Sequence, residues 1–164
     1  MKNIVLIGMP GAGKSTIGVL LAKSMLYSFV DTDLMIQNCC GKSLCDIIDE
    51  NGTDAFLRIE NDVICAAEFD RCVIATGGSA VYGEEAMEKL RADSTVIYLN
   101  LPLAEIERRL GDIHTRGVAM KNGTTVAELY NERKSLYEKY ADITLECSGL
   151  TAEQCVDRII SLLK

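Results

Sequence analysis

The chain has 164 residues, which is the length of one globular domain. With 48% hydrophobic and 25% charged residues it can bury a core of ordinary size, which excludes an intrinsically disordered chain. Twenty-four acidic against seventeen basic residues give a net charge of −7, which argues against a broad binding surface for nucleic acid or an anionic membrane. The sequence has no membrane-spanning apolar run and no pattern of a secretory signal at its start. We therefore expect a cytoplasmic protein that holds any anionic ligand in a local site.

The predicted elements alternate along the chain between short apolar runs and longer amphipathic stretches. In chain order, the predicted strands are residues 3–7, 28–31, 72–76, 95–99 and 143–145. Most are continuous runs of Val, Ile and Leu, as expected for parallel strands with helices on both faces. Helical spacing follows in residues 14–25, and again near the end of the chain behind a capping box of Thr151 and Gln154. The pattern predicts the α/β class: a three-layer α/β/α fold around a five-stranded parallel sheet, in a single domain of residues 1–164.

The cysteines argue against a zinc site and against catalytic thiol chemistry. There are seven, without a CxxC pair, and His114 is the only histidine. We interpret Cys65, Cys72 and Cys155 as small buried thiols in a reducing compartment. No paired base is visible to activate a catalytic cysteine.

The strongest motif follows the first predicted strand. Residues 8–15 read GMPGAGKS and match G-x-x-x-x-G-K-[ST] in full, between an apolar strand and an amphipathic helix. In such a loop backbone N–H groups surround phosphate oxygens, Lys14 reaches the β and γ phosphates, and Ser15 offers a hydroxyl to Mg²⁺. A glycine-rich turn that happens to contain a lysine is the alternative. We predict a P-loop that binds a nucleoside triphosphate through Gly11, Ala12, Gly13, Lys14, Ser15 and Thr16.

A second candidate site lies at the end of the second predicted strand, in Asp31-Thr32-Asp33. Residues i and i+2 of a strand share a face, and ligands of open α/β sheets bind at the carboxyl ends of the strands. One carboxylate could support Mg²⁺ while the other binds a substrate hydroxyl and accepts its proton. The alternative is that these carboxylates are simply exposed to solvent or cap the next helix, which would be the usual interpretation of such residues without a P-loop.

Three further features are candidates for the acceptor side of the site. Gly77 and Gly78 follow the third predicted strand and permit either a close backbone approach to a ligand or a plain turn. Residues 111–123 contain three glycines and no sustained period, which predicts a lid or, as the alternative, a disordered surface loop. Guanidinium groups suit phosphates and substrate carboxylates, but composition does not choose among Arg108, Arg109, Arg116 and Arg133.

Together these motifs resemble the shikimate kinase family over nearly the whole chain. The matching segments are GMPGAGKST at 8–16, DTD at 31–33, FLRIE at 56–60, ATGGS at 75–79, RRL…TRG within 108–117, and ERKSLYEKYAD at 132–142. The resemblance implies a small P-loop kinase that transfers the γ-phosphate of MgATP to the 3-hydroxyl of shikimate under a closing lid.

The resemblance also implies the catalytic and metal-binding roles. Lys14, Asp33 and Arg116 would be catalytic: Lys14 at the phosphates, Asp33 at the substrate hydroxyls as candidate base, and Arg116 as the lid cation. Ser15 and Asp31 would serve Mg²⁺.

The acceptor site and the adenine site are implied in the same way. Gly77 and Gly78 would line the acceptor site, and Arg133 would hold the substrate carboxylate. Arg109 would stack near adenine.

The chain departs from the family pattern on the acceptor side. Where the family reads F-R-x-x-E this chain reads F-L-R-I-E, so Leu57 stands where a second arginine for the carboxylate is expected. Arg58 is the neighbouring candidate for substrate binding, although adjacent helical residues point about 100° apart. Ser79 replaces a third glycine, and Gly117 replaces the proline that follows the lid arginine.

We interpret the chain as a monomeric, ATP- and Mg²⁺-dependent kinase of this type, with an acceptor-binding segment at about 31–60. Two alternatives stay open. Because the departures cluster on the acceptor side, the acceptor could be another small hydroxylated compound. The chain could also be a catalytically silent nucleotide-binding domain with a regulatory role.

Overall fold

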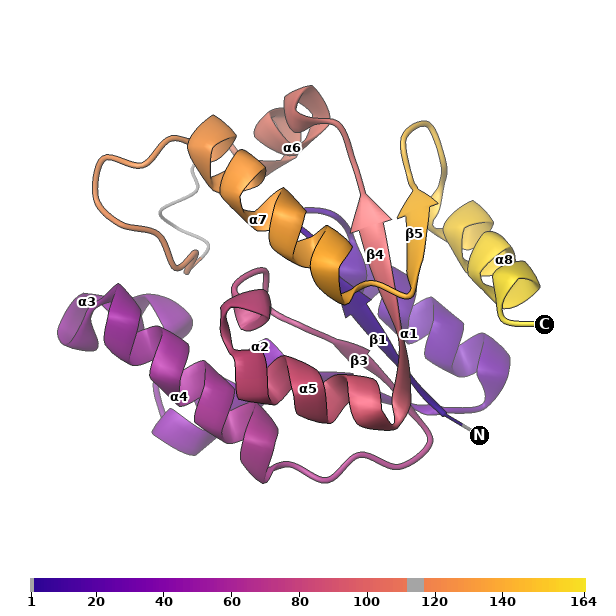
Figure 1. The fold of residues 1–164 in the computed structure, drawn as a ribbon, viewed down its shortest axis with the longest axis horizontal. Helices are drawn as coiled ribbons and strands as arrows, with labels where there is room; N and C mark the ends of the chain where they lie inside the picture. The colour runs from indigo at the N-terminus through magenta and orange to yellow at the C-terminus, as the bar shows by residue number, and fades with distance from the viewer. Residues whose placement is uncertain (1, 112–116) are drawn as a thin grey trace.

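A sheet of five parallel strands runs through the molecule in the order β2-β3-β1-β4-β5 (Figure 1). The computed structural model describes residues 2–111 and 117–164. The strands are β1 (Asn3–Ile7), β2 (Ser28–Asp31), β3 (Cys72–Ala75), β4 (Ser94–Asn100) and β5 (Ile143–Glu146). All five residues of β1 are buried, as expected for a central strand with helices on both faces. The predicted strands are confirmed, with differences of at most one residue at each end.

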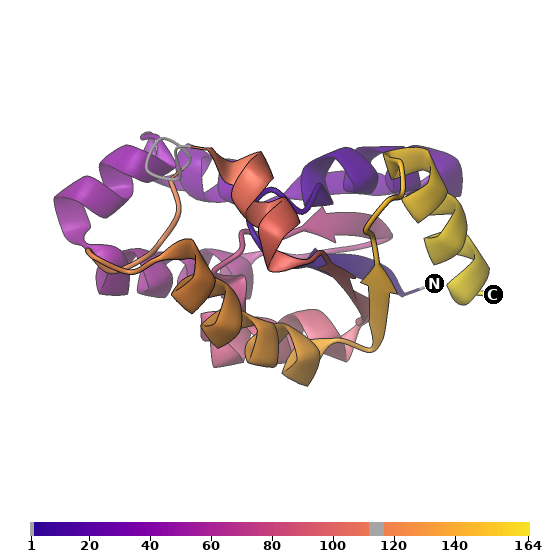
Figure 2. The same ribbon diagram turned by 90° about the horizontal axis from the view of Figure 1, so that it is seen from above.

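Helices cover both faces of this sheet, which confirms the predicted three layers (Figures 1 and 2). α1 (Lys14–Met25) and α8 (Ala152–Leu162) lie on one face, and α5 (Glu84–Ala92) and α7 (Val126–Tyr140) lie on the other. Between α7 and the sheet the rings of Tyr98 and Tyr137 stack with their centroids 5.1 Å apart. A short 3₁₀ helix, η1 (Ala80–Tyr82), follows β3, and the helix α6 (Leu103–Leu110) follows β4.

Three further helices pack together beside the sheet and form a second, smaller core. They are α2 (Thr32–Cys40), α3 (Leu44–Asn51) and α4 (Thr53–Ala66). The buried residues of this core are Ile36, Ile47 and Phe56 from the helices and Ala119 from the segment that follows Gly117. Because Ala119 belongs to this core, the described end of the expected lid is anchored on the α2–α4 group.

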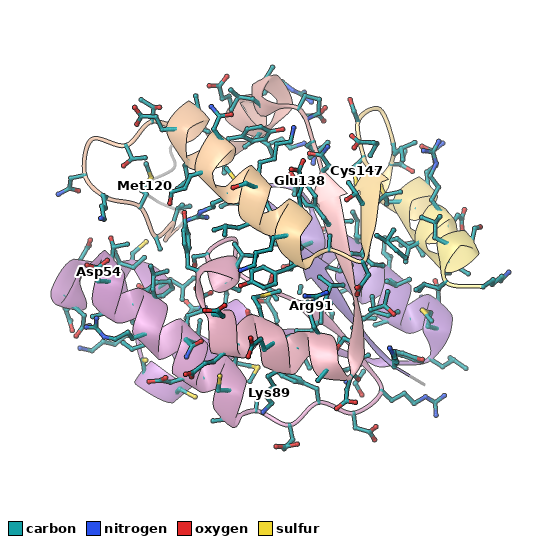
Figure 3. The ribbon with its side chains drawn as sticks, in the orientation of Figure 1. Asp54, Lys89, Arg91, Met120, Glu138 and Cys147 are labelled. Atoms are coloured by element: carbon teal, nitrogen blue, oxygen red, sulfur yellow. The ribbon has the colours of Figure 1, made fainter. Side chains whose placement is uncertain are left out.

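The backbone at Gly117 explains one departure from the family pattern. Its φ of +63° lies in the left-handed region, which a proline, fixed near −65°, cannot adopt. A Cβ at this position would also lie 2.7 Å from the Cβ of Leu44. Three residues further on, the backbone carbonyl of Met120 accepts a hydrogen bond from Thr53 Oγ1 at 3.2 Å. Met120 and Asp54, both labelled in Figure 3, line one hollow.

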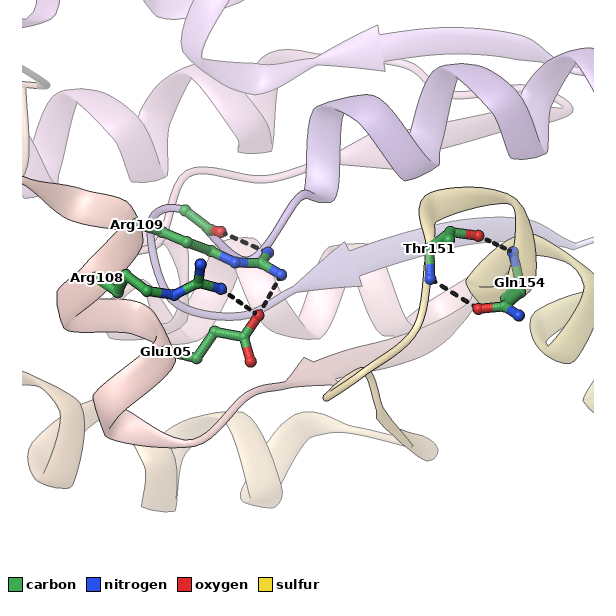
Figure 4. Close-up of polar contacts among 6 residues, drawn as sticks. Glu105, Arg108, Arg109, Thr151 and Gln154 are labelled. Atoms are coloured by element: carbon green, nitrogen blue, oxygen red, sulfur yellow. Dashed lines mark hydrogen bonds and ion pairs between the residues drawn. The ribbon is translucent and has the colours of Figure 1, made fainter.

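The capping residues define where three helices begin. At α8, Thr151 Oγ1 accepts from Gln154 N and Gln154 Oε1 accepts from Thr151 N, which confirms the predicted capping box (Figure 4). Thr125 and Glu128 form a second capping box at α7. At α2 the cap is Asp31, the last residue of β2. The strand therefore passes into the helix without a loop, and this places the DTD segment at the carboxyl edge of the sheet.

Two of the three cysteines interpreted as small buried thiols are fully buried. Cys72 and Cys155 are buried as expected, whereas Cys65 is only partly buried. Among residues 2–111 and 117–164, no group of three or more His, Cys, Asp and Glu side chains could hold a metal ion. Within the same residues, no helix is long and apolar enough to cross a membrane.

Candidate active site

A cleft of about 400 Å³ lies at the edge of the sheet where β1, β2 and β3 end. This is the edge at which parallel α/β sheets bind ligands. The structure brings most of the candidate residues to this one cleft: Gly11, Gly13, Lys14, Ser15, Thr16, Asp33, Gly77, Gly78 and Arg133. Phosphate-binding and acceptor-binding candidates therefore share one space.

The P-loop places the start of α1 at the cleft. No side chain caps the N-terminus of α1, so the first N–H groups of the helix are available to a ligand. The positive end of the helix dipole points in the same direction. A helix terminus of this kind, opening from a glycine-rich loop, suits a phosphate group.

Lys14 is buried at the base of this loop. Its Nζ donates hydrogen bonds to the carbonyl oxygens of Gly8 at 2.7 Å and Met9 at 2.8 Å. Burial lowers the pKa of Lys14 to about 8, an effect that the carboxylate of Asp33 opposes and the guanidinium of Arg133 adds to. A buried ammonium group at a phosphate-binding loop is suited to compensate the charge of an anionic ligand.

Ser15 and Asp31 form an oxygen-rich pair at the mouth of the loop. Ser15 Oγ donates to Asp31 Oδ2 at 2.8 Å, while Asp31 Oδ1 accepts from the backbone N–H of Asp33 at 2.9 Å. A hydroxyl and a carboxylate are the hard oxygen ligands that Mg²⁺ prefers. The donor set at these two residues therefore fits the metal.

Asp33 and Glu60 flank Gly77 at the floor of the cleft. A Cβ on Gly77 would lie 2.6 Å from Asp33 Oδ1 and 2.8 Å from Glu60 Oε2, so only glycine fits between the two carboxyl groups. Burial raises the pKa of Asp33, with the charge of Asp31 adding to the effect and Lys14 opposing it. A half-buried carboxyl group with a raised pKa is suited to accept a proton from a bound hydroxyl.

Arg133 approaches the cleft from α7 and is fully buried. Its Nη2 donates to the carbonyl of Ala119 at 2.5 Å, and its guanidinium lies over the ring of Tyr82 at 5.4 Å. Its Nη1 borders Gly78, where a Cβ would come within 2.9 Å of it. Tyr137 Oη donates to the carbonyl of Gly78 at 2.7 Å and holds this part of the floor. Arg133 thus presents a guanidinium edge to a ligand at Gly78.

Three of the candidate arginines do not line the cleft among the described residues. Arg109 donates to the carbonyl of Gly11 at 3.2 Å and to the carboxylate of Glu105 at 2.6 Å, so it lies against the outer side of the P-loop (Figure 4). Arg108 is exposed and pairs with the same carboxylate. Arg58 is exposed and lines a different hollow, together with Asp54. Three candidates remain. Ala12 is buried within the loop, Asp31 contacts Ser15 without lining the cleft itself, and Arg116 lies outside the described residues.

The placement of Arg58 follows from the helix on which it lies. Phe56, two positions earlier on α4, is buried and lines the cleft, whereas Arg58 points away from it. Leu57 is partly buried and lines a hollow of about 260 Å³ that borders the cleft at Ala119. The expectation that Arg58 binds the acceptor therefore finds no support in its position on the helix.

Glu60 and Ser79 are two site residues to which sequence reasoning assigned no role. Ser79 Oγ donates to Glu60 Oε1 at 2.6 Å, and both side chains are buried beside the cleft. Burial raises the pKa of Glu60 from 4.5 to about 7, with Asp33 adding to the effect, while the Ser79 hydrogen bond, Arg133 and Lys14 oppose it. The segment FLRIE contains Glu60, but nothing in its local pattern distinguishes a buried carboxyl from a solvated one.

A P-loop with its buried lysine, a hydroxyl–carboxylate pair and a second carboxyl group in the same cleft define a P-loop phosphotransferase. A family model described as shikimate kinase matches residues 10–164. The chain belongs to the shikimate kinase family.

Individual relatives agree with this assignment. The shikimate kinase of Francisella tularensis subsp. novicida is 37% identical over 99% of this chain and 94% of its own length. That of Persephonella marina is 34% identical over the full length of both chains. Among solved structures, shikimate kinase from Acinetobacter baumannii in complex with shikimate matches with a TM-score of 0.89 and 27% identity, over 99% of this chain and 93% of its own.

The variant Glu60→Gln tests the burial of this carboxyl group. Between pH 4.5 and about 7 the folded protein holds a proton on Glu60 that the unfolded chain has released, so the free energy of unfolding falls as the pH rises through this window. Glutamine does not titrate. In urea denaturation we expect Glu60→Gln to gain stability relative to wild type from pH 5 to about pH 8.

The exposed carboxyl group of Asp62, on the same helix, supplies the control Asp62→Asn. A stability difference between Glu60→Gln and wild type that stays constant with pH would show that the carboxyl group is not held in a desolvated environment.

Proposed function

We propose that this enzyme transfers the γ-phosphate of ATP to the 3-hydroxyl of shikimate. The observation that carries the proposal is one cleft whose lining combines the P-loop and Lys14 with Asp33, Arg133 and the glycines at 77 and 78. Such an arrangement can hold a nucleotide phosphate and a small anionic alcohol next to each other. The relative from Acinetobacter baumannii, described in complex with shikimate, supports this choice of acceptor.

The ATP side of the mechanism depends on positioning and charge. The free N–H groups at the start of α1 bind phosphate oxygens, and Lys14 compensates the charge that develops on the transferred group. Ser15 and Asp31 would hold Mg²⁺, which supplies charge compensation to the phosphates when bound. Arg116, outside the described residues, remains our candidate for a further cation, and Arg109 our candidate for the adenine side through its position behind Gly11.

The acceptor side depends on Asp33 and Arg133. Asp33 lies beside Gly77, where it can orient the attacking hydroxyl and accept its proton, a task that its raised pKa favours. Arg133 would bind the carboxylate of the acceptor through the guanidinium edge that borders Gly78. With the nucleotide on the P-loop, the hydroxyl would attack the γ-phosphate and ADP would be the leaving group.

We further propose that the enzyme works as a monomer in the cytoplasm. One chain supplies the residues proposed for both the nucleotide and the acceptor. The seven cysteines, without a CxxC pair, suit a reducing compartment.

A second candidate is a kinase for another small hydroxylated acid, and one position favours it. Because residue 57 is a leucine, Arg133 supplies the only guanidinium group that lines the cleft among the described residues. Losing one charge-assisted contact to a carboxylate weakens binding by about 1.5 to 3 kcal/mol. The acceptor assay below includes both candidates.

The proposal is tested by a coupled assay of ADP release with shikimate and a panel of other hydroxylated acids and polyols. We expect shikimate to give the highest kcat/KM. If the enzyme releases no more ADP with shikimate than it does with water as the acceptor, while another acceptor turns over rapidly, the second candidate replaces the first.

Replacing the lysine of the P-loop separates catalysis from folding. Lys14→Met should lower kcat by about a hundredfold or more, because the developing phosphoryl charge loses its buried cation. The fold should survive, since the change removes a desolvated ammonium group. The matched control is Lys23→Met, an exposed lysine in the last turn of the same helix. Unchanged turnover in Lys14→Met would contradict the mechanism.

Restoring an arginine at position 57 tests the identity of the acceptor. The side chain of residue 57 lies in the hollow that also contains Tyr82 and Ala119, both of which contact Arg133. If the acceptor is shikimate, Leu57→Arg should lower its KM by about tenfold, since a second guanidinium can reach the carboxylate.

The control for Leu57→Arg is Ala66→Arg, which adds the same charge at an exposed position on α4. An unchanged KM in Leu57→Arg would indicate that leucine at this position reflects a different acceptor.

A further inference from the structure

The guanidinium group of Arg133 is fixed within the protein through two of its three nitrogen atoms. Nη2 donates a hydrogen bond to the carbonyl of Ala119 at 2.5 Å, and Nε donates to the hydroxyl of Tyr82 at 3.4 Å. The third nitrogen, Nη1, borders Gly78 on the floor of the cleft. The orientation of Nη1 toward the cleft therefore depends on how firmly the other two nitrogens are held.

Tyr82 contacts this guanidinium group in two ways. Its hydroxyl accepts the hydrogen bond from Nε, and the carbon Cζ of Arg133 lies 5.4 Å from the centroid of its ring, at the distance of a cation–π interaction. Arg133 is fully buried, and a buried cation is costly unless its surroundings compensate the charge. One side chain thus supplies both a hydrogen-bond acceptor and an aromatic face to the same cation.

Glu132 orients the hydroxyl of Tyr82. Tyr82 Oη donates to Glu132 Oε1 at 2.6 Å, so its proton points to the carboxylate and its lone pairs remain for Nε of Arg133. Glu132 precedes Arg133 on α7 and is exposed, because adjacent helical residues point about 100° apart. The contacts form a chain from Glu132 through Tyr82 to Arg133, in which each hydrogen bond polarises the next.

Tyr82 lies beside the cleft and does not line it. Its side chain lines the hollow of about 260 Å³ that also contains Leu57 and Glu132, whereas Arg133 lines the cleft. Tyr82 can therefore influence an acceptor through Arg133. Because residue 57 provides no second guanidinium group, the placement of this one arginine has a larger effect on a bound carboxylate.

We propose that Tyr82, oriented by Glu132, is a positioning residue of the acceptor site, which holds the guanidinium group of Arg133 in the orientation that binds the carboxylate of the acceptor. The inference rests on the proposed function, because it requires an acid group of the acceptor at Arg133. An arginine that is already fixed loses less conformational freedom on binding, so the contribution of Tyr82 is expected in the KM for the acceptor.

The test uses variants that remove the contacts of Tyr82 one at a time. Tyr82→Phe removes the hydroxyl and keeps the ring, Tyr82→Leu removes both, and Glu132→Gln removes the charge that orients the hydroxyl. The control is Tyr27→Phe, because Tyr27 lies under the guanidinium group of Arg71 at 5.7 Å and neither residue lines the cleft. The measured quantities are kcat, KM for shikimate and KM for ATP, with thermal unfolding of each variant.

We expect Tyr82→Phe to raise the KM for shikimate by about threefold to tenfold, the effect of one lost hydrogen bond. Tyr82→Leu should raise it further, and Glu132→Gln should raise it by less. The KM for ATP should be unchanged in all three, because the P-loop does not contact Tyr82. Tyr27→Phe should match wild type in every quantity.

A double-mutant cycle with Arg133→Lys shows whether Tyr82 acts through the arginine. Lysine keeps the charge but has no Nε–H group to donate to the hydroxyl, so in this background Tyr82→Phe should change the KM for shikimate by less than about twofold. An effect of the same size in both backgrounds would contradict the inference. If Arg133→Lys does not fold, the single variants decide, because a merely structural role would change the KM for ATP and for shikimate together.

Two further outcomes would overturn the inference. If folded Tyr82→Phe and Tyr82→Leu keep the wild-type KM for the acceptor, or if both substrates are affected equally, Tyr82 has only a structural role. If wild type does not phosphorylate shikimate, the proposed function fails, which is distinguishable because it needs no variant. The same comparison is then made with the acid that has the highest kcat/KM, and if no acid is an acceptor the inference fails as well.

Discussion

The site depends on the burial of charge at one edge of the sheet. Within residues 2–111 and 117–164, three residues of charged type are buried, and all three lie at or beside the cleft: Lys14, Glu60 and Arg133. Charged groups leave water only at a high cost unless hydrogen bonds or a ligand compensate them. The P-loop carbonyls compensate Lys14, and Ala119 and Tyr82 compensate Arg133. Glu60 is compensated on one oxygen only, by the hydroxyl of Ser79.

The smaller core, formed by α2, α3, α4 and Ala119, also supplies part of the lining of the cleft on the proposed acceptor side. Phe56 and Ala119 belong both to this core and to the lining of the cleft. The carbonyl of Ala119 also fixes the guanidinium of Arg133. Packing of the α2–α4 group against the segment after Gly117 therefore sets the shape of the acceptor site, while the large core under the P-loop sets the nucleotide side.

The fold and the nucleotide side could be predicted from the sequence because their signals are local. Apolar runs gave the strands to within one residue, and the spacing of the P-loop placed Lys14 and Ser15. Strand geometry already predicted two carboxylates at 31 and 33 facing one crevice, whereas the choice of Arg133 among the arginines needed the family resemblance, because Arg133 comes to the cleft only in the fold. Glu60 had no assigned role because its environment comes from Ser79, nineteen residues away along the chain. Arg58 was assigned to the acceptor by its neighbourhood in sequence, but the rotation of α4 directs it elsewhere.

The most direct test of this account concerns Gly77, which lines the cleft and lies against the carboxyl groups of Asp33 and Glu60. The φ of Gly77 is outside the left-handed region, so its backbone accepts alanine, but the added methyl group would displace the carboxyl groups of Asp33 and Glu60. The measurement is kcat/KM for shikimate, alongside ATP affinity by calorimetry. We predict that kcat/KM falls by about tenfold to a hundredfold, because small displacements of an acceptor are costly in rate, while ATP affinity is unchanged. Wild-type kcat/KM in Gly77→Ala would contradict the account, because the acceptor would then not rest on this floor.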